Sequence, residues 1–397
     1  GQAPYRSSLE PGGSTLLEGW LELIHDLISQ KVPLPILECS AGFHTPPDPL
    51  RDPEAAAEWP WWKAQKWALH VVSRLSSRYG DPKSLAFQHS RAISGSKGTP
   101  AASNAVAAVE KEREFAESWA KGHGVGEQFL QAVLEGPLAR AGAYFNAEAA
   151  AAAAGSSEAQ REVLQSNWVS PRALNLALKF VNLAVPLSSP WRALKPHAAA
   201  LVSAVSLPCA AFDDADEELW DSDPAELVRR STDAVVELYS PRAAAVNFVV
   251  ALCRQRGATA LAPTMTAIGA SLQQLLLLSQ QQQQQQQPQG AENSAIRHVE
   301  RRADGALLLA GSLADTLKKK PAYASQIEPL LSSVVLPLFS SPRGHLRARA
   351  CWVVGQFADA ELLQEEEEEE KKKKTGAGPV FDAMFDAVVA SLNDPEL

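Results

Sequence analysis

The chain has 397 residues, of which 46% are hydrophobic and 21% are charged, so it is able to bury a sizeable core. Its formal net charge of −9 argues against general nucleic-acid binding and suits basic protein partners. Aromatic residues make up only 7% of the chain, while alanine and leucine are abundant; this composition favours helices over strands.

Apolar side chains recur at spacings of three and four along most of the chain, which predicts amphipathic helices. Short turns with proline or glycine separate these helices. Ser170-Pro171, for example, pairs a capping residue with proline at the first helical position. In chain order, the predicted helices cover residues 15–29 and 59–79, a stretch from 105 that includes 129–134, and then 171–185, 195–212, 224–238, a stretch from 241, 304–317, 327–339, 346–357 and 381–392.

Polar and biased segments interrupt this pattern. Residues 41–58 are rich in proline and acidic side chains and predict a loop. Four further segments read as low-complexity insertions, one with an alanine tract, one with a glutamine tract and one with a run of Glu and Lys. We expect these four insertions near residues 91–104, 146–158, 279–295 and 364–378.

Residues 327–357 show the architecture most clearly. Two amphipathic helices flank the polar turn 340–344, which contains Pro342 and Gly344. A pair of this kind is unable to bury both apolar stripes alone and needs a similar neighbour on each side. Two helices recur roughly every forty residues, which is the period of HEAT and armadillo repeats. The sequence therefore predicts an all-α superhelix over residues 1–397, with the chain cut at both ends.

No motif for chemistry is evident. The cysteines Cys39, Cys209, Cys253 and Cys351 are scattered, without the spacing of a zinc site or a disulfide framework. The sequence also lacks a phosphate-binding glycine loop, a metalloprotease motif and a nucleophile elbow. No apolar run approaches the roughly 18 residues of a membrane span. We therefore expect no catalytic, cofactor-binding or metal site and no membrane insertion.

Several segments, in their order along the chain, resemble the importin-β superfamily of nuclear transport receptors, in particular its importin seven and importin eight branch. Each segment alone is a weak signal, whereas the ordered set is specific. The segments are Trp61-Trp62-Lys63, Leu194-Lys195-Pro196-His197, Asp214 to Trp220, Asp304-Gly305-Ala306-Leu307, and Arg347 to Val353. The four insertions depart from the family pattern.

The resemblance implies a HEAT-repeat receptor that carries cargo through nuclear pores and shuttles between cytoplasm and nucleus. Its implied partners are Ran in the GTP form, basic cargo such as ribosomal proteins and histones, and nucleoporins with FG repeats at the nuclear envelope. A static HEAT-repeat scaffold that Ran does not regulate is the first alternative. A helical enzyme is the second, although the sequence offers no constellation of catalytic groups.

The acidic run 213–223 is the best candidate for a contact with cargo or Ran, because clustered carboxylates attract basic surfaces. An ordinary solvated loop is the alternative. Trp220 favours a docked, ordered loop. Serine at Asp214, Asp216, Glu217 and Glu218 is the substitution that this hypothesis suggests. The candidate residues are Asp213, Asp214, Asp216, Glu217, Glu218, Trp220, Asp221 and Asp223.

Other conspicuous side chains favour structural roles. Trp59, Trp61, Trp62 and Trp67 lie at helical spacings and predict packing between helices rather than an FG-repeat pocket. Arg347 and Arg349 predict an internal ladder with carboxylates and carbonyls of a neighbouring repeat rather than a phosphate site. His70 and His197 have no further ligand at metal spacing and read as packing histidines.

Overall fold

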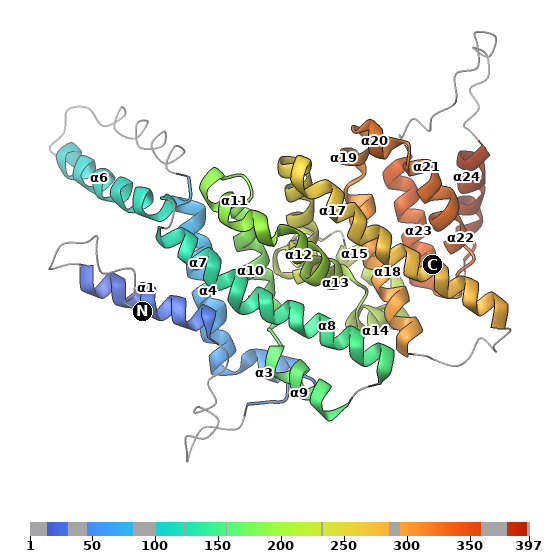
Figure 1. Ribbon diagram of the computed structural model, residues 1–397, viewed down its shortest axis with the longest axis horizontal. Coiled ribbons are helices and arrows are strands. Elements are labelled where there is room, and N and C mark those ends of the chain that lie inside the picture. The colour runs from blue at the N-terminus through green and yellow to red at the C-terminus, as the bar shows by residue number, and fades with distance from the viewer. Residues whose placement is uncertain are drawn as a thin grey trace, which may run out of the picture. The chain divides into compact units, whose positions relative to one another are not determined.

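A computed structural model describes residues 14–30, 46–81, 101–121, 124–155, 157–231, 233–285, 294–358 and 379–394. The described residues form helices and turns without a strand, so the predicted all-α class is confirmed (Figure 1). The chain divides into two compact units, Gly1–Val205 and Ser206–Leu397. A single continuous solenoid over 1–397 stays a prediction.

The described residues of the first unit form short and medium-length helices. They are α1 (Ser14–Ser29), α3 (Pro53–Glu58), α4 (Pro60–Tyr79), α6 (Ala101–Ala120), α7 (Val125–Val133), η2 (Leu134–Leu138), α8 (Ala139–Ala154), α9 (Glu158–Asn167), α10 (Pro171–Ala184), α11 (Ser188–Leu194), η3 (Lys195–His197), α12 (Ala198–Leu201) and η4 (Val202–Ser206), whose last residue already belongs to the second unit.

The second unit contains the acidic run and the hairpin. Its helices are α13 (Leu207–Ala210), α14 (Asp214–Ser222), α15 (Pro224–Ser231), α16 (Ala234–Tyr239), α17 (Pro241–Gln285), α18 (Ser294–Ser312), α19 (Ala314–Lys318), α20 (Pro321–Ala324), α21 (Ile327–Leu330), η5 (Leu331–Val335), α22 (Leu336–Leu338), α23 (Gly344–Phe357) and α24 (Pro379–Ser391). The predicted hairpin is confirmed, with α21 to α22 as its first arm and α23 as its second.

Within the first unit, the tryptophan-rich helix α4 packs against α1 and α10. Trp62 is buried and meets Trp168 edge to face, with ring centroids 5.1 Å apart. Trp59 and Trp61 pack against the same cluster. Trp67 is 60% exposed, so the packing prediction is wrong for this residue. It lies on the opposite side of α4 from the buried Leu69 and Val72, because one helical turn spans 3.6 residues.

In the part of the chain that the structure describes, three stretches of π-helix interrupt the longer helices, and each accompanies a proline. Pro137 lies inside η2, Pro208 follows η4 by two residues, and Pro337 follows η5 by two residues. Proline lacks an N–H and its ring clashes with the carbonyl four residues earlier, which a wider π-turn relieves. As a result, α7, η2 and α8 continue as one rod despite Pro137 (Figure 1).

The structure places three of the four predicted insertions partly inside helices. The alanine tract lies in α8, which ends at Gly155 with a φ of 84°, and Ser157 then caps α9. The first glutamines of the second tract continue α17 as far as Gln285. The loop predicted at 41–58 contains the short helix α3, which Asp52 caps. Of the insertion predicted at 91–104, residues 101–104 begin α6, and residues 91–100 lie outside the described residues, as does the whole insertion at 364–378.

By length and composition alone, Ser188–Ser222 and Pro241–Gln281 are apolar enough to cross a membrane, contrary to the sequence expectation. This is weak evidence, because core helices pass the same test. The first stretch includes the 3-10 turn η3 and the break between α13 and α14. The second is kinked at Arg256, where φ is −124° and ψ is 27°. Neither stretch is therefore one regular helix.

Helix α18 is the central helix of the second unit and packs against α13, α17 and α23 (Figure 1). A close backbone approach fixes its position on α13: a Cβ atom added to Gly305 would lie 2.7 Å from the nitrogen of Ala211 and 2.8 Å from the carbonyl carbon of Ala210. Because both neighbours are backbone atoms, only glycine fits without moving the helices apart.

We expect Gly305→Ala to destabilise the protein by about 1–3 kcal/mol, because overpacking forces the two backbones to shift. The matched control is Gly269→Ala in α17, where an added Cβ has no neighbour within 4 Å. Relief of the glycine penalty in a helix should stabilise the control by up to about 1 kcal/mol. Urea unfolding followed by circular dichroism measures both, and equal effects of the two substitutions would contradict the close-approach explanation.

Candidate functional site

The acidic run forms a helix, not the loop that the sequence suggests. Helix α14 begins after Asp213, whose carboxylate accepts a hydrogen bond from the backbone N–H of Asp216 at 2.8 Å. The carboxylate of Asp216 in turn accepts from the N–H of Asp213 at 3.1 Å. This reciprocal arrangement is a capping box, and acidic groups in the first turn also favour the positive end of the helix dipole.

Aromatic side chains dock this acidic helix. Trp220 is 8% exposed and meets the ring of His345 edge to face at 6.5 Å. Phe212, just before the helix, stacks on the same imidazole with centroids 4.1 Å apart and planes 8° from parallel. Trp220 is therefore docked as predicted, but it lies on a helix and not on the predicted ordered loop. The segment attaches to α23, which carries His345.

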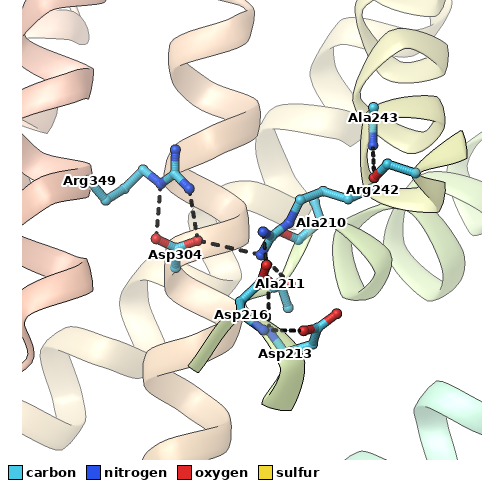
Figure 2. Close-up of polar contacts among 9 residues, drawn as sticks. Ala210, Ala211, Asp213, Asp216, Arg242, Ala243, Asp304 and Arg349 are labelled. Atoms are coloured by element: carbon cyan, nitrogen blue, oxygen red, sulfur yellow. Dashed lines mark hydrogen bonds and ion pairs between the residues drawn. The ribbon is translucent and has the colours of Figure 1, made fainter. Parts of the chain in front are cut away.

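Arg242 of α17 ties the start of α14 to the helices beneath it (Figure 2). Its Nη1 lies 2.7 Å from Oδ2 of Asp216. Its Nε and Nη2 donate to the carbonyls of Ala210 and Ala211 at 3.1 and 2.5 Å, and Nη2 lies 4.0 Å from Oδ2 of Asp304. Arg242 therefore joins two carboxylates to the open carbonyl end of α13.

Arg349 of α23 completes this network (Figure 2). Its Nε and Nη2 donate to the two carboxylate oxygens of Asp304 at 2.9 and 3.2 Å. Asp304 is 1% exposed. Burial alone would raise its pKa, but Arg349 and Arg242 outweigh burial and hold the pKa below its usual value. Arg347 likewise binds Asp394 through two bonds, so the predicted arginine ladder is confirmed.

Burial shifts two other groups at this site. It raises the pKa of Asp216 to about 6, although the nearby Arg242 opposes the shift. It lowers the pKa of His345 to about 4, against the attraction of Asp304 and Glu217 for the charged imidazole. In both cases loss of contact with water disfavours the charged form.

A second set of ion pairs joins the first turn of α14 to α18. Nη2 of Arg301 donates to Oδ1 of Asp214 at 2.6 Å and also to Oε2 of Glu217. Arg297 lies one turn earlier on α18, with its Nη1 3.8 Å from the same Glu217 oxygen. Two of the run's carboxylates are thus neutralised by arginines of the same chain.

The eight predicted site residues therefore divide by role. Asp213 and Asp223 cap helices, the latter by accepting from the N–H of Glu226 at 2.9 Å. Asp214, Asp216 and Glu217 pair with internal arginines, and Trp220 is buried. Glu218 and Asp221 are exposed and have no ion pair in the described part of the chain.

This division changes how the site must be tested. Serine at Asp214, Asp216, Glu217 and Glu218 together would also remove Asp216, whose pair with Arg242 holds the start of α14, so weaker binding would not distinguish a lost contact from a displaced helix. Substitutions at Glu218 and Asp221 avoid this problem, because neither side chain contributes to the network.

Sequence reasoning missed the partners of the run. Arg242, Arg297, Arg301 and His345 belong to helices 20 to 130 residues further along the chain, and single arginines carry no signal of which carboxylate they will meet. Asp304 is part of a segment used for the family resemblance, but nothing in its sequence context marks it as a buried ion-pair partner.

The described residues include no group of three or more His, Cys, Asp and Glu side chains that is able to hold a metal. Cys209, Cys253 and Cys351 are free thiols, and Cys39 lies outside the described residues. Burial raises the pKa of Cys209 to about 12, which keeps this thiol protonated and unreactive at neutral pH. The exposed carboxylates of α14 are suited to electrostatic attraction of positively charged surfaces.

The two buried titrating groups predict opposite effects of acid on stability. Between pH 6.5 and about 4 an unfolded chain carries a proton on His345 that the folded chain does not, so stability falls as the pH drops through this window. Between about pH 6 and 3.8 the folded chain carries a proton on Asp216 that the unfolded chain does not, so this group stabilises the fold on acidification.

We therefore expect His345→Phe, which retains a ring to stack on Phe212, to lose less stability than the unchanged chain between pH 7 and pH 5. The difference should be on the order of 2 kcal/mol, since one pKa unit corresponds to about 1.4 kcal/mol. Over the same pH range, Asp216→Asn should lose more stability than the unchanged chain. Urea unfolding at the two pH values is the measurement, and identical pH dependence of all three proteins would rule out this assignment.

No protein-family model matches the sequence. The chain is 30% identical over 310 residues to the Importin beta-like SAD2 homolog of Arabidopsis thaliana, a match that covers 78% of the chain and 24% of the relative. It is 28% identical over 355 residues to Importin-8 of Danio rerio, covering 89% of the chain and 28% of the relative. A probable importin-7 homolog of Dictyostelium discoideum is 29% identical over 184 residues, covering 46% of the chain and 16% of the relative.

The chain spans about a quarter of the length of the first two relatives. Similarity to importins from plant, animal and amoeba over most of the chain agrees with the ordered segments that carry the resemblance. Together with the helical structure, it confirms the predicted fold class, an all-α superhelix of the HEAT type. The chain belongs to the importin-β superfamily of nuclear transport receptors.

Proposed function

We propose that this chain acts in nuclear import, as part of a receptor that binds cargo proteins and the GTPase Ran and carries cargo through the nuclear pore. The observation that carries this proposal is the similarity to importins over most of the chain. It implies shuttling between cytoplasm and nucleus, with FG-repeat nucleoporins as partners at the pore. No covalent step is required.

The outward side of α14 is the proposed contact for cargo. Glu218 and Asp221 are exposed and unpaired in the described residues, and Asp214 is 90% exposed despite its bond to Arg301. Carboxylates on a docked helix present a fixed negative surface without the entropy cost of ordering a loop. Basic proteins such as ribosomal proteins and histones are the proposed cargo class.

Release of cargo by Ran-GTP requires that the two partners compete. Such competition is a coupling free energy between two binding events and acts in both directions. A static HEAT-repeat scaffold would bind partners without this coupling. Ran binding therefore separates the proposed receptor from the scaffold alternative.

We expect immobilised chain to retain a basic ribosomal protein and to release it on addition of Ran-GTP but not Ran-GDP. Human Importin-8, one of the relatives, serves as the positive control. A chain that retains the ribosomal protein equally with and without Ran-GTP, while Importin-8 releases it, would favour the scaffold.

The double substitution Glu218→Gln and Asp221→Asn should weaken binding of the ribosomal protein by about three- to tenfold at low salt and less at high salt, because exposed charges are screened. The matched control is Glu158→Gln with Glu162→Gln, which removes two exposed carboxylates from α9. Fluorescence anisotropy titrations measure both. Equal losses in the two variants would show that net charge, and not α14, attracts the cargo.

A further inference from the structure

Arg301 occupies two carboxylates, Asp214 and Glu217, next to the surface proposed above for cargo. Its side chain is 17% exposed, whereas that of Asp214, to which it donates at 2.6 Å, is 90% exposed. The same Nη2 donates to Glu217, and Arg297 approaches that residue from the same helix. Two carboxylates in the first turn of α14, those of Asp214 and Glu217, are thus already paired with arginines of the same chain.

Other contacts already hold α14 against its neighbours. Asp216 pairs with Arg242, and Trp220 packs on His345. The backbone N–H of Phe212 donates to the backbone carbonyl of Arg301 at 3.3 Å, a bond that does not involve the arginine side chain. The guanidinium of Arg301 therefore adds charge neutralisation to a helix that is anchored by other means.

We propose that Arg301 is an internal competitor for the basic partner: its guanidinium occupies Asp214 and Glu217, and a partner gains these carboxylates only by displacing it. The proposal rests on the function proposed above and deepens it. A partner first meets the open carboxylates Glu218 and Asp221. A guanidinium of the partner then replaces that of Arg301 at Asp214 and Glu217. Only a partner with enough positive charge to displace Arg301 therefore binds both pairs of carboxylates.

The two pairs of carboxylates should consequently contribute unequally. At the exposed Asp214, exchange of one ion pair for another changes the free energy little, whereas a new pair with an unoccupied carboxylate is a net gain. Removal of the Arg301 charge converts the exchange into a net gain. Binding of a basic partner should then become about two- to fivefold tighter, which is the range for one exposed pair.

The test uses the full chain and a fluorescein-labelled peptide of alternating arginine and serine at low salt. Arg301→Gln should bind the peptide about two- to fivefold more tightly than the unchanged chain. The matched control is Arg254→Gln, which removes the same charge from an exposed position of α17. This control should change the affinity little. Arg301→Lys, which retains the charge, should stay close to the unchanged chain.

A double-mutant cycle then isolates the competition. In a chain with Asp214→Asn and Glu217→Gln, the further change Arg301→Gln should have no effect, because no carboxylate remains to be released. An equal gain in Arg254→Gln, or a gain that persists in the Asp214→Asn, Glu217→Gln chain, would overturn the proposal. So would unchanged affinity of a folded Arg301→Gln protein.

A second comparison covers the case in which Arg301→Gln does not fold. Neutralising the occupied pair with Asp214→Asn and Glu217→Gln should cost less affinity than neutralising the open pair with Glu218→Gln and Asp221→Asn. The reverse order would contradict an internal competitor. If only the Glu218, Asp221 variant loses binding and Arg301→Gln gains none, the proposed cargo surface is supported and the competitor role of Arg301 is ruled out. If neither the unchanged chain nor any variant binds the peptide, both proposals are ruled out.

Discussion

The buried carboxylate of Asp304 lies between the guanidinium groups of Arg349 and Arg242. At 1% exposure it has lost nearly all contact with water, a loss that is costly unless cations and hydrogen bonds replace the solvent. Arg349 supplies both from α23, and Arg242 adds a second positive charge from α17. Helices α17 and α23 must therefore both meet α18 at Asp304. This requirement constrains how the helices of the second unit pack.

The acidic helix α14 depends on the same point. Arg242 reaches from Asp304 to Asp216 and also to the two carbonyls at the end of α13, so the start of α14 is held where it can dock its aromatic ring. The charges of the run then separate into a set that pairs with arginines of the same chain and a set, Glu218 and Asp221, that faces solvent and that we propose for partners. A rigid negative surface follows from this division, since the paired set fixes the orientation of the open one.

Prolines and glycines make the packing of these helices possible. Three prolines sit in or just after π-turns, which absorb the missing hydrogen bond without ending the helix. Gly305 lets α18 touch the backbone at the end of α13. This contact lies next to Asp304 in the sequence, so the closest backbone approach and the buried ion pair constrain the same helical turn.

Local rules allowed much of this to be read from the sequence. Apolar spacing gave the helical hairpin 327–357, the Ser170-Pro171 signal located the start of α10, and Arg349 was expected to serve a neighbouring repeat. The same rules failed where one helix has two apolar sides. Trp62 and Trp67 both lie on α4, yet Trp62 is buried against Trp168 of another part of the unit, whereas Trp67 is exposed and makes ring contacts with residues of its own helix. The π-turns were also missed, because a proline in a helical pattern predicts a break as readily as a bulge.

The sequence by itself determined the helical class, the order of the hairpins and the acidic character of 213–223, because periodicity and charge are local properties. Only the tertiary structure decided which of those carboxylates face solvent. That outcome depends on Arg242, Arg301 and His345, which reach α14 from other helices. Contacts between residues far apart in the chain leave no pattern in a single sequence, so the division of the acidic run into paired and open carboxylates becomes visible only once the helices are packed.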